Sequence, residues 1–288
     1  MKLKLNPLQK VTAVLTIYAS GAISVNLGQD VIYHLLATVG FAVILFFLFS
    51  KLSGKKKNIY NTLISSLIIF LVLHYGTGTS ELIYPLLATF ITIFSKFFLE
   101  IKGSPVINPV VFGLLLTYFI TLVVPGLEPL FISWWGTSYS YSIAYDTGNY
   151  FLDTPIPIAL IIIAIWILFH LKPWRKYPIL ISFLLLHAAI LFIQDFFFSQ
   201  ATGIDKKCDT TFLCFTFTDA TIYFFASIML IEPRTSPILK KGQIVYGTLA
   251  ALTYNLIRYL GYAHFDLIAI AIANLYFFIS KKLKANKS

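Results

Sequence analysis

The chain has 288 residues, of which 58% are hydrophobic and only 12% are charged, and its mean hydropathy is +0.82. Soluble domains carry about 25% charged residues, and this sequence offers no polar faces that would cover its 27 Phe and 17 Tyr residues. The formal charge of +10 comes from short lysine clusters between apolar runs, which indicates cytoplasmic loops and argues against nucleic acid as a partner.

Apolar runs of membrane-spanning length recur along the whole chain. A transmembrane helix needs roughly 17 to 25 mainly apolar residues, and the strands of a membrane barrel are shorter and alternate in polarity. We therefore predict an all-α, polytopic integral membrane protein of about ten transmembrane helices, forming one transmembrane domain over residues 1–288. The predicted segments are 11–26, 31–50, 59–75, 81–99, 105–124, 154–171, 177–194, 211–231, 243–260 and 263–280.

Lysine and arginine residues alternate between the two sides of these segments. The amino terminus, every second loop and the carboxyl-terminal tail are basic, whereas Gly76–Ser80 and residues 125–153 contain no Lys or Arg. Lys206 and Lys207 are the exception, and aspartates nearby offset them. Because positive loops resist translocation, we expect both termini in the cytoplasm and the protein in the inner (plasma) membrane, surrounded by the lipid bilayer.

One long loop divides the predicted helices into two halves. Residues 125–153 join residues 1–124 to residues 154–280 and are rich in Trp, Tyr, Ser and Gly. Aromatic residues of this kind gather where a membrane meets water. We expect this loop to be external and to be the natural place for an external site.

An ionisable residue inside a span is costly and therefore indicates function. Asp219 falls within the eighth predicted segment and is flanked by Thr216, Thr218 and Thr221. These hydroxyls are suited to hydrogen-bonding the carboxylate or to helping it coordinate a cation. A polar contact between helices, or a position wetted from the outer side, is the alternative.

Two proline-containing segments interrupt the helical pattern. The first holds Asn108 and Pro109 at the start of the fifth predicted helix, and the second, Glu232–Pro237, includes Glu232, Thr235 and Ser236. Proline at such places leaves backbone groups that protein or water must satisfy. Broken helix ends of this kind line cavities and contact ions or anionic ligands. The alternative is an ordinary proline-punctuated loop.

Metal binding and hydrolytic catalysis have no support in the sequence. The histidines at or within spans, His74, His170 and His187, have no companions at ligand spacing, which favours structural roles. Cys208 and Cys214 are too few for a disulfide scaffold and lack the spacing of a zinc or iron–sulfur site; a disulfide between them requires that both face outward. No nucleophile, base and orienting group can be placed together.

Several landmarks nevertheless resemble the NqrB/RnfD family, in the same order along the chain. They are Ile107-Asn108-Pro109 with Gly113, Asp153-Thr154, Met229 to Pro237, Lys241-Gly242, Tyr246-Gly247, Ile257-Arg258 and Asn274. The resemblance implies a ten-helix membrane subunit of an Rnf or sodium-translocating NADH:quinone reductase complex, which couples electron transfer to cation translocation. It further implies other membrane subunits, and quinone, as partners.

In that family, FMN is attached through its phosphate to the threonine of an external Ser-Gly-Ala-Thr motif. This chain has no such motif, so a non-covalent FMN or riboflavin is expected, with Thr147 and Thr154 as the candidate cofactor-binding threonines. A redox role depends on such a cofactor, because the protein's own side chains supply no electron carrier. Two other roles remain open: a small-solute or ion channel of urea-channel-like fold, and an anchor for a soluble reductase.

Overall fold

The computed structural model describes most of the chain, and most of the described residues are helical. They are residues 6–26, 29–73, 79–101, 103–130, 132–138, 158–170, 175–202 and 219–285. The strands among them, β1 (Glu100–Ile101) and β2 (Ser104–Pro105), pair with each other. The chain divides into two compact units, unit 1 from Met1–Glu100 and Pro109–Trp166, and unit 2 from Ile101–Asn108 and Ile167–Ser288.

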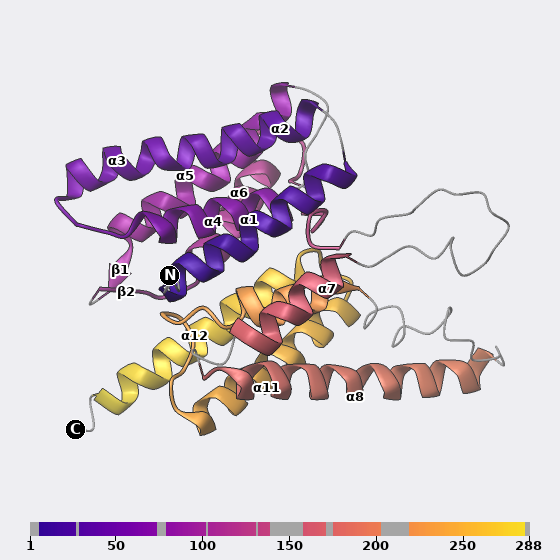
Figure 1. Cartoon of the computed structure of the whole chain (residues 1–288). Coiled ribbons are helices and arrows are strands. Elements are labelled where there is room, and N and C mark those ends of the chain that lie inside the picture. Colours follow the sequence, from indigo (N-terminus) through magenta and orange to yellow (C-terminus); the bar gives the residue numbers. More distant parts are fainter. Residues whose placement is uncertain are drawn as a thin grey trace, which may run out of the picture. The chain divides into compact units, whose positions relative to one another are not determined.

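Unit 1 is a bundle in which α5 packs against α3 and α6, and α1 packs against α4 (Figure 1). The π-helix η1 joins α2 to α3, so the three form one continuous helix of 25 residues. Helix α7 passes into the π-helix η3, where the chain leaves unit 1. The elements are α1 (Pro7–Val25), α2 (Gln29–Leu35), η1 (Leu36–Gly40), α3 (Phe41–Ser53), α4 (Ile59–Val72), η2 (Thr79–Leu82), α5 (Ile83–Phe98), α6 (Pro109–Val123), α7 (Ile158–Ile165) and η3 (Trp166–His170).

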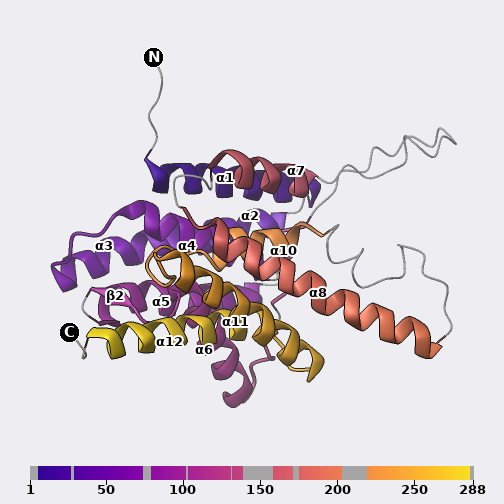
Figure 2. The ribbon, with the colours of Figure 1, turned by 90° about the horizontal axis from the view of Figure 1, so that it is seen from below.

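Unit 2 is built around α11, which packs against α8 on one side and α12 on the other (Figure 2). The short helix α10 continues as the π-helix η6, which ends at Met229. The proline-containing segment Glu232–Pro237 follows shortly after it. The elements are α8 (Tyr177–Thr202), α10 (Ala220–Phe224), η6 (Phe225–Met229), α11 (Lys240–Tyr259) and α12 (Phe265–Ala285).

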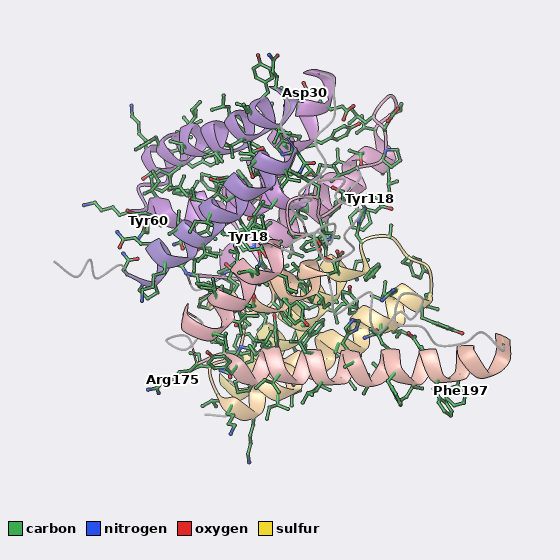
Figure 3. All side chains as sticks on the ribbon, turned by 45° about the vertical axis from the view of Figure 1, so that its right-hand side comes forward. Tyr18, Asp30, Tyr60, Tyr118, Arg175 and Phe197 are labelled. Atoms are coloured by element: carbon green, nitrogen blue, oxygen red, sulfur yellow. The ribbon has the colours of Figure 1, made fainter. Side chains whose placement is uncertain are left out.

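The prediction of a helical protein is confirmed for the described residues, and each of the predicted segments overlaps at least one of these helices. Among the described residues, three helical stretches are long and apolar enough to cross a membrane: Pro7–Val25, Gln29–Ser53 and Tyr177–Gln194. Large apolar side chains point outward from the helices, as Phe197 does from α8, where its side chain is 64% exposed (Figure 3). Such a surface is suited to contact with lipid.

Helix α4 ends inside unit 1, and the first part of the long loop satisfies its last carbonyl groups. Without partners, the final carbonyls of a helix would be left unbonded in an apolar interior. The donors are Ser133 N (3.2 Å) and Trp134 N (2.9 Å) to Val72 O, Gly136 N to Leu71 O (2.9 Å), and the Trp135 indole Nε1 to Phe70 O (2.8 Å). The described part of this loop is therefore an integral part of unit 1.

Glycines allow close helix contacts in both units. A Cβ atom on Gly113 of α6 would lie 2.0 Å from the Thr92 hydroxyl and 2.8 Å from the Ala88 carbonyl of α5. In unit 2, Gly247 of α11 lies equally close to α8. Small residues at helix contacts let backbones approach closely, which is the usual way helices associate in lipid.

Candidate functional site

Unit 2 contains a buried hydrogen-bonded network centred on two asparagines. The backbone N–H of Asn108 donates to Asn274 Oδ1 at 2.7 Å, and the Asn108 side-chain Nδ2 donates to the Met229 carbonyl at 3.3 Å. Asn274 Nδ2 donates to the Thr235 carbonyl at 3.3 Å and to the Tyr246 hydroxyl. We call these residues, Asn108, Met229, Thr235, Tyr246 and Asn274, the asparagine network.

The asparagine network is buried and joins distant parts of the chain. Asn108 is 4% exposed, Asn274 1% and Tyr246 fully buried, and the two asparagines are 166 residues apart in sequence. Buried amides are costly unless they are hydrogen-bonded, and a satisfied network holds its segments in one arrangement. The network therefore fixes the segment before α6, the end of η6, and helices α11 and α12 within unit 2.

The helix end at Met229 explains why the network forms there. Leu230 N bonds to the Phe225 carbonyl at 2.9 Å, which closes the wide turn of the π-helix η6. The chain then turns away, so the Met229 carbonyl loses its place in a helical ladder and accepts from Asn108 instead. Wide turns of this kind are frequent at functional sites.

The Glu232–Pro237 segment is folded around the backbone and side chain of Glu232. The Glu232 carbonyl accepts from Ser236 N at 3.1 Å and from the Ser236 hydroxyl at 2.7 Å, and the Thr235 hydroxyl donates to Glu232 Oε2 at 3.3 Å. These local bonds replace the helical ladder that Pro233 and Pro237 interrupt. The segment is therefore a defined turn that directs the Thr235 carbonyl toward Asn274.

Lys176, which directly precedes α8, holds the same segment from its other side. Its ammonium donates to the Ser236 carbonyl at 3.2 Å, the Ser236 hydroxyl at 3.1 Å and the Pro237 carbonyl at 2.5 Å, and the residue is only 4% exposed. Burial lowers the pKa of Lys176 from 10.5 to about 8. This role is not predictable from the sequence, because Lys176 belongs to a basic cluster typical of a cytoplasmic loop.

Lys176 should make the stability of the protein depend on pH in a particular window. Its folded-state pKa of about 8 lies below its unfolded value of 10.5, so unfolding takes up a proton between these two pH values. The stability of the wild type relative to Lys176→Met should therefore rise with pH across that window, by up to about 3 kcal/mol. Thermal unfolding in detergent between pH 7 and pH 11 measures this difference; a flat or falling difference would contradict it.

The structure brings together four of the residues singled out in the sequence and leaves others elsewhere. Asn108, Glu232, Thr235 and Ser236 meet in or beside the asparagine network. Pro109 is the first residue of α6, a favoured place for proline because the N–H it lacks has no partner inside a helix there. Thr147 and Thr154 lie outside the described residues.

Asp219 lies at the opposite end of α10 and η6 from the asparagine network. Its carboxylate accepts from Thr221 N at 2.9 Å and so caps the start of α10. Helix Ala220–Met229 separates it from Met229, a rise of roughly 15 Å at 1.5 Å per residue. Thr216 and Thr218, its neighbours in the sequence, lie outside the described residues.

A second buried polar pair lies between α8 and α11. His187 Nδ1 is 3.1 Å from Asn255 Oδ1, and the His187 ring stacks on Phe183 and meets Tyr254 edge to face. This arrangement accords with a structural histidine. Among the described residues, no group of three His, Cys, Asp or Glu side chains is placed to hold a metal ion.

Comparison of the sequence with protein-family models and with curated proteins finds no match. The asparagine network can hold helix ends in place and can present hydroxyl, carbonyl and carboxylate oxygens from the Glu232–Pro237 segment.

Proposed function

We propose that the chain is a multi-pass plasma-membrane subunit of an Rnf or Nqr-type electron-transport complex, which couples electron transfer to cation translocation. The proposal includes about ten spans with both termini in the cytoplasm, and other membrane subunits and quinone as partners. The three helical stretches long enough to span a membrane and the alternation of basic loops support the membrane location.

The observation that carries the proposal is the convergence of the motif residues. Asn108, Thr235, Tyr246 and Asn274 come from separate landmarks of the resemblance, and all four meet in one buried network. A chance likeness gives no reason for such residues to touch. Their contact gives the motifs a common structural purpose, which is to stabilise the broken helix end at Met229.

A flavin, FMN or riboflavin held without a covalent bond, would supply the one- and two-electron chemistry that the side chains lack. The candidate threonines for holding it, Thr147 and Thr154, lie outside the described residues.

Cations would bind at two separate places, one at each end of α10 and η6. Asp219 supplies a carboxylate at one end, and Glu232 with the Thr235 hydroxyl supplies oxygens at the other. Oxygen ligands of these types suit hard cations. The same broken helix favours the second candidate, a small-solute or ion channel, because interrupted helices line polar passages through a membrane.

The visible absorption spectrum of the protein, purified in detergent with its native neighbours, tests the redox proposal. We expect a flavin spectrum and, after acid precipitation, flavin in the supernatant, because the covalent motif is missing. Flavin in the pellet would retain the redox role and direct attention to Thr147 and Thr154 as attachment sites. A colourless protein would overturn the redox proposal in favour of the channel.

A further inference from the structure

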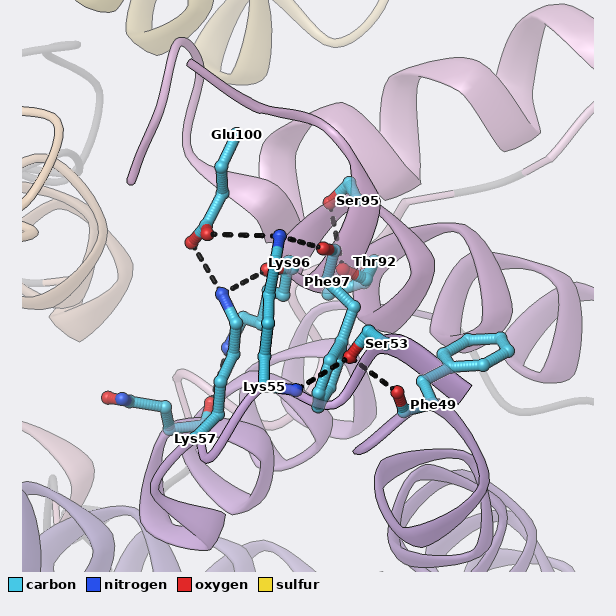
Figure 4. A network of polar contacts seen from close by, with 10 residues as sticks. Phe49, Ser53, Lys55, Lys57, Thr92, Ser95, Lys96, Phe97 and Glu100 are labelled. Atoms are coloured by element: carbon cyan, nitrogen blue, oxygen red, sulfur yellow. Dashed lines mark hydrogen bonds and ion pairs between the residues drawn. The ribbon is translucent and has the colours of Figure 1, made fainter. Parts of the chain in front are cut away.

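A cluster of lysines lies in unit 1, where α3 gives way to α4 and α5 ends (Figure 4). Lys57 donates to Glu100 Oε1 at 2.6 Å and to the Lys96 carbonyl. Lys55 donates to the Phe97 carbonyl at 2.6 Å, with its ammonium 4.0 Å from Glu100 Oε2. The Lys96 ammonium turns instead to a carbonyl and a hydroxyl of α4. We call Lys55, Lys57, Lys96 and Glu100 the lysine cluster.

Positive charge exceeds negative charge in this cluster. Of its three ammonium groups, those of Lys55 and Lys57 lie against the single carboxylate, and the side chain of Glu100 is only 8% exposed. Lys55 is the outward member, with its side chain 47% exposed, and the exposed Lys51 and Lys56 stand on either side of it in the sequence. The exposed Lys51, Lys55 and Lys56 therefore leave a net positive charge at the surface, which attracts an anion.

Exposed apolar side chains adjoin the cluster. Leu48 and Leu52, in the last turns of α3, are 49% and 68% exposed, and Phe98 and Leu99, at the end of α5, are 41% and 47% exposed. The elements that carry the lysines therefore also present an apolar surface. This combination suits an anionic phospholipid: the lysines can bind its charged headgroup, and the neighbouring apolar side chains can contact its acyl chains.

We propose that Lys51, Lys55 and Lys56 bind the phosphate headgroup of an anionic phospholipid, whose acyl chains lie along α3 and the end of α5. The lysine cluster holds Lys55 in place for this contact. A soluble anion would use the charge but would leave the apolar flank uncovered. The site requires only that α3 face a bilayer, and it does not depend on electron transfer.

Native mass spectrometry of the detergent-purified protein, titrated with dioleoyl phosphatidylglycerol or dioleoyl phosphatidylcholine, tests this site. Removing one surface lysine should weaken anionic-lipid binding roughly fivefold, so Lys51→Gln/Lys55→Gln/Lys56→Gln should weaken it about a hundredfold. Lys51→Gln/Lys56→Gln keeps the bond from Lys55 to Phe97 and should weaken binding about 25-fold, even if the triple variant fails to fold.

The matched control is Lys240→Gln/Lys241→Gln/Lys281→Gln, which removes the same charge from exposed positions in unit 2. We expect the control to keep its affinity for phosphatidylglycerol within a few-fold, and phosphatidylcholine binding to be weak in every variant. An equal loss in both triple variants would show a general charge effect and overturn the site. Undiminished binding in the Lys51/Lys56 variant, or equal affinity for the two lipids, would overturn it as well.

Discussion

Replacing Asn274 with leucine should lower the free energy of unfolding by about 3 to 5 kcal/mol. Leucine has nearly the same volume but removes the acceptor of the Asn108 N–H and the donor to the Thr235 carbonyl and the Tyr246 hydroxyl. Because Asn108 and Tyr246 are buried, water has little access to replace these bonds. Thermal unfolding in detergent measures the change.

Asn255→Leu is the matched control for this substitution. Asn255 is also buried, but its Nδ2 bonds to Ala251 within the same helix, and its one bond beyond that helix joins Oδ1 to His187. We expect a loss of about 1 to 2 kcal/mol. Equal losses for the two variants would mean that Asn274 is an ordinary buried amide, and the asparagine network would lose its special structural importance.

Gly247→Ala should destabilise unit 2 by about 3 kcal/mol, through overpacking against a backbone. The new Cβ would lie 2.2 Å from the Ser182 hydroxyl, which can rotate away, and 2.5 Å from the Ile179 carbonyl, which cannot. Helices α8 and α11 would have to separate. Hydrogen exchange in these two helices, together with the unfolding temperature in detergent, measures the effect.

Gly40→Ala provides the opposite expectation for the same change of residue. A Cβ on Gly40 meets nothing within 4 Å, and its backbone is helical. Alanine is favoured over glycine inside a helix by about 0.5 to 1 kcal/mol, so this variant should be slightly more stable than the wild type. If Gly247→Ala were as well tolerated as Gly40→Ala, the close contact between α8 and α11 would be contradicted.

The approximate positions of the helices could be predicted from the sequence because most of them lie in apolar runs between polar or proline-containing stretches. The helix ends are less predictable where distant residues decide them. The predicted third segment extends to residue 75, whereas α4 ends at Val72, where Ser133 and Trp134 bond to its final carbonyl. The single predicted segment 31–50 corresponds to the continuous helix Gln29–Ser53, but its π-helical turn, Leu36–Gly40, has no signature in the hydropathy pattern.

The candidate site was partly predictable, because proline and asparagine mark broken helix ends. Asn108, Glu232, Thr235 and Ser236 were singled out on that ground, and Tyr246 and Asn274 through the resemblance. Lys176 was not predicted, because charge patterns do not distinguish a buried lysine from one in a loop. Asp219, expected inside a span, caps the start of α10; a carboxylate at that place is also favoured by the helix dipole.

Cation uptake into liposomes tests the central claim most directly. The chain would be reconstituted once with its native neighbours and once alone, and uptake would be followed before and after addition of a reductant. The redox proposal predicts uptake only with the partner subunits present and only after the reductant is added. Passage of a cation or small solute through liposomes containing the chain alone, with no reductant, would contradict the proposal and identify the chain as a channel.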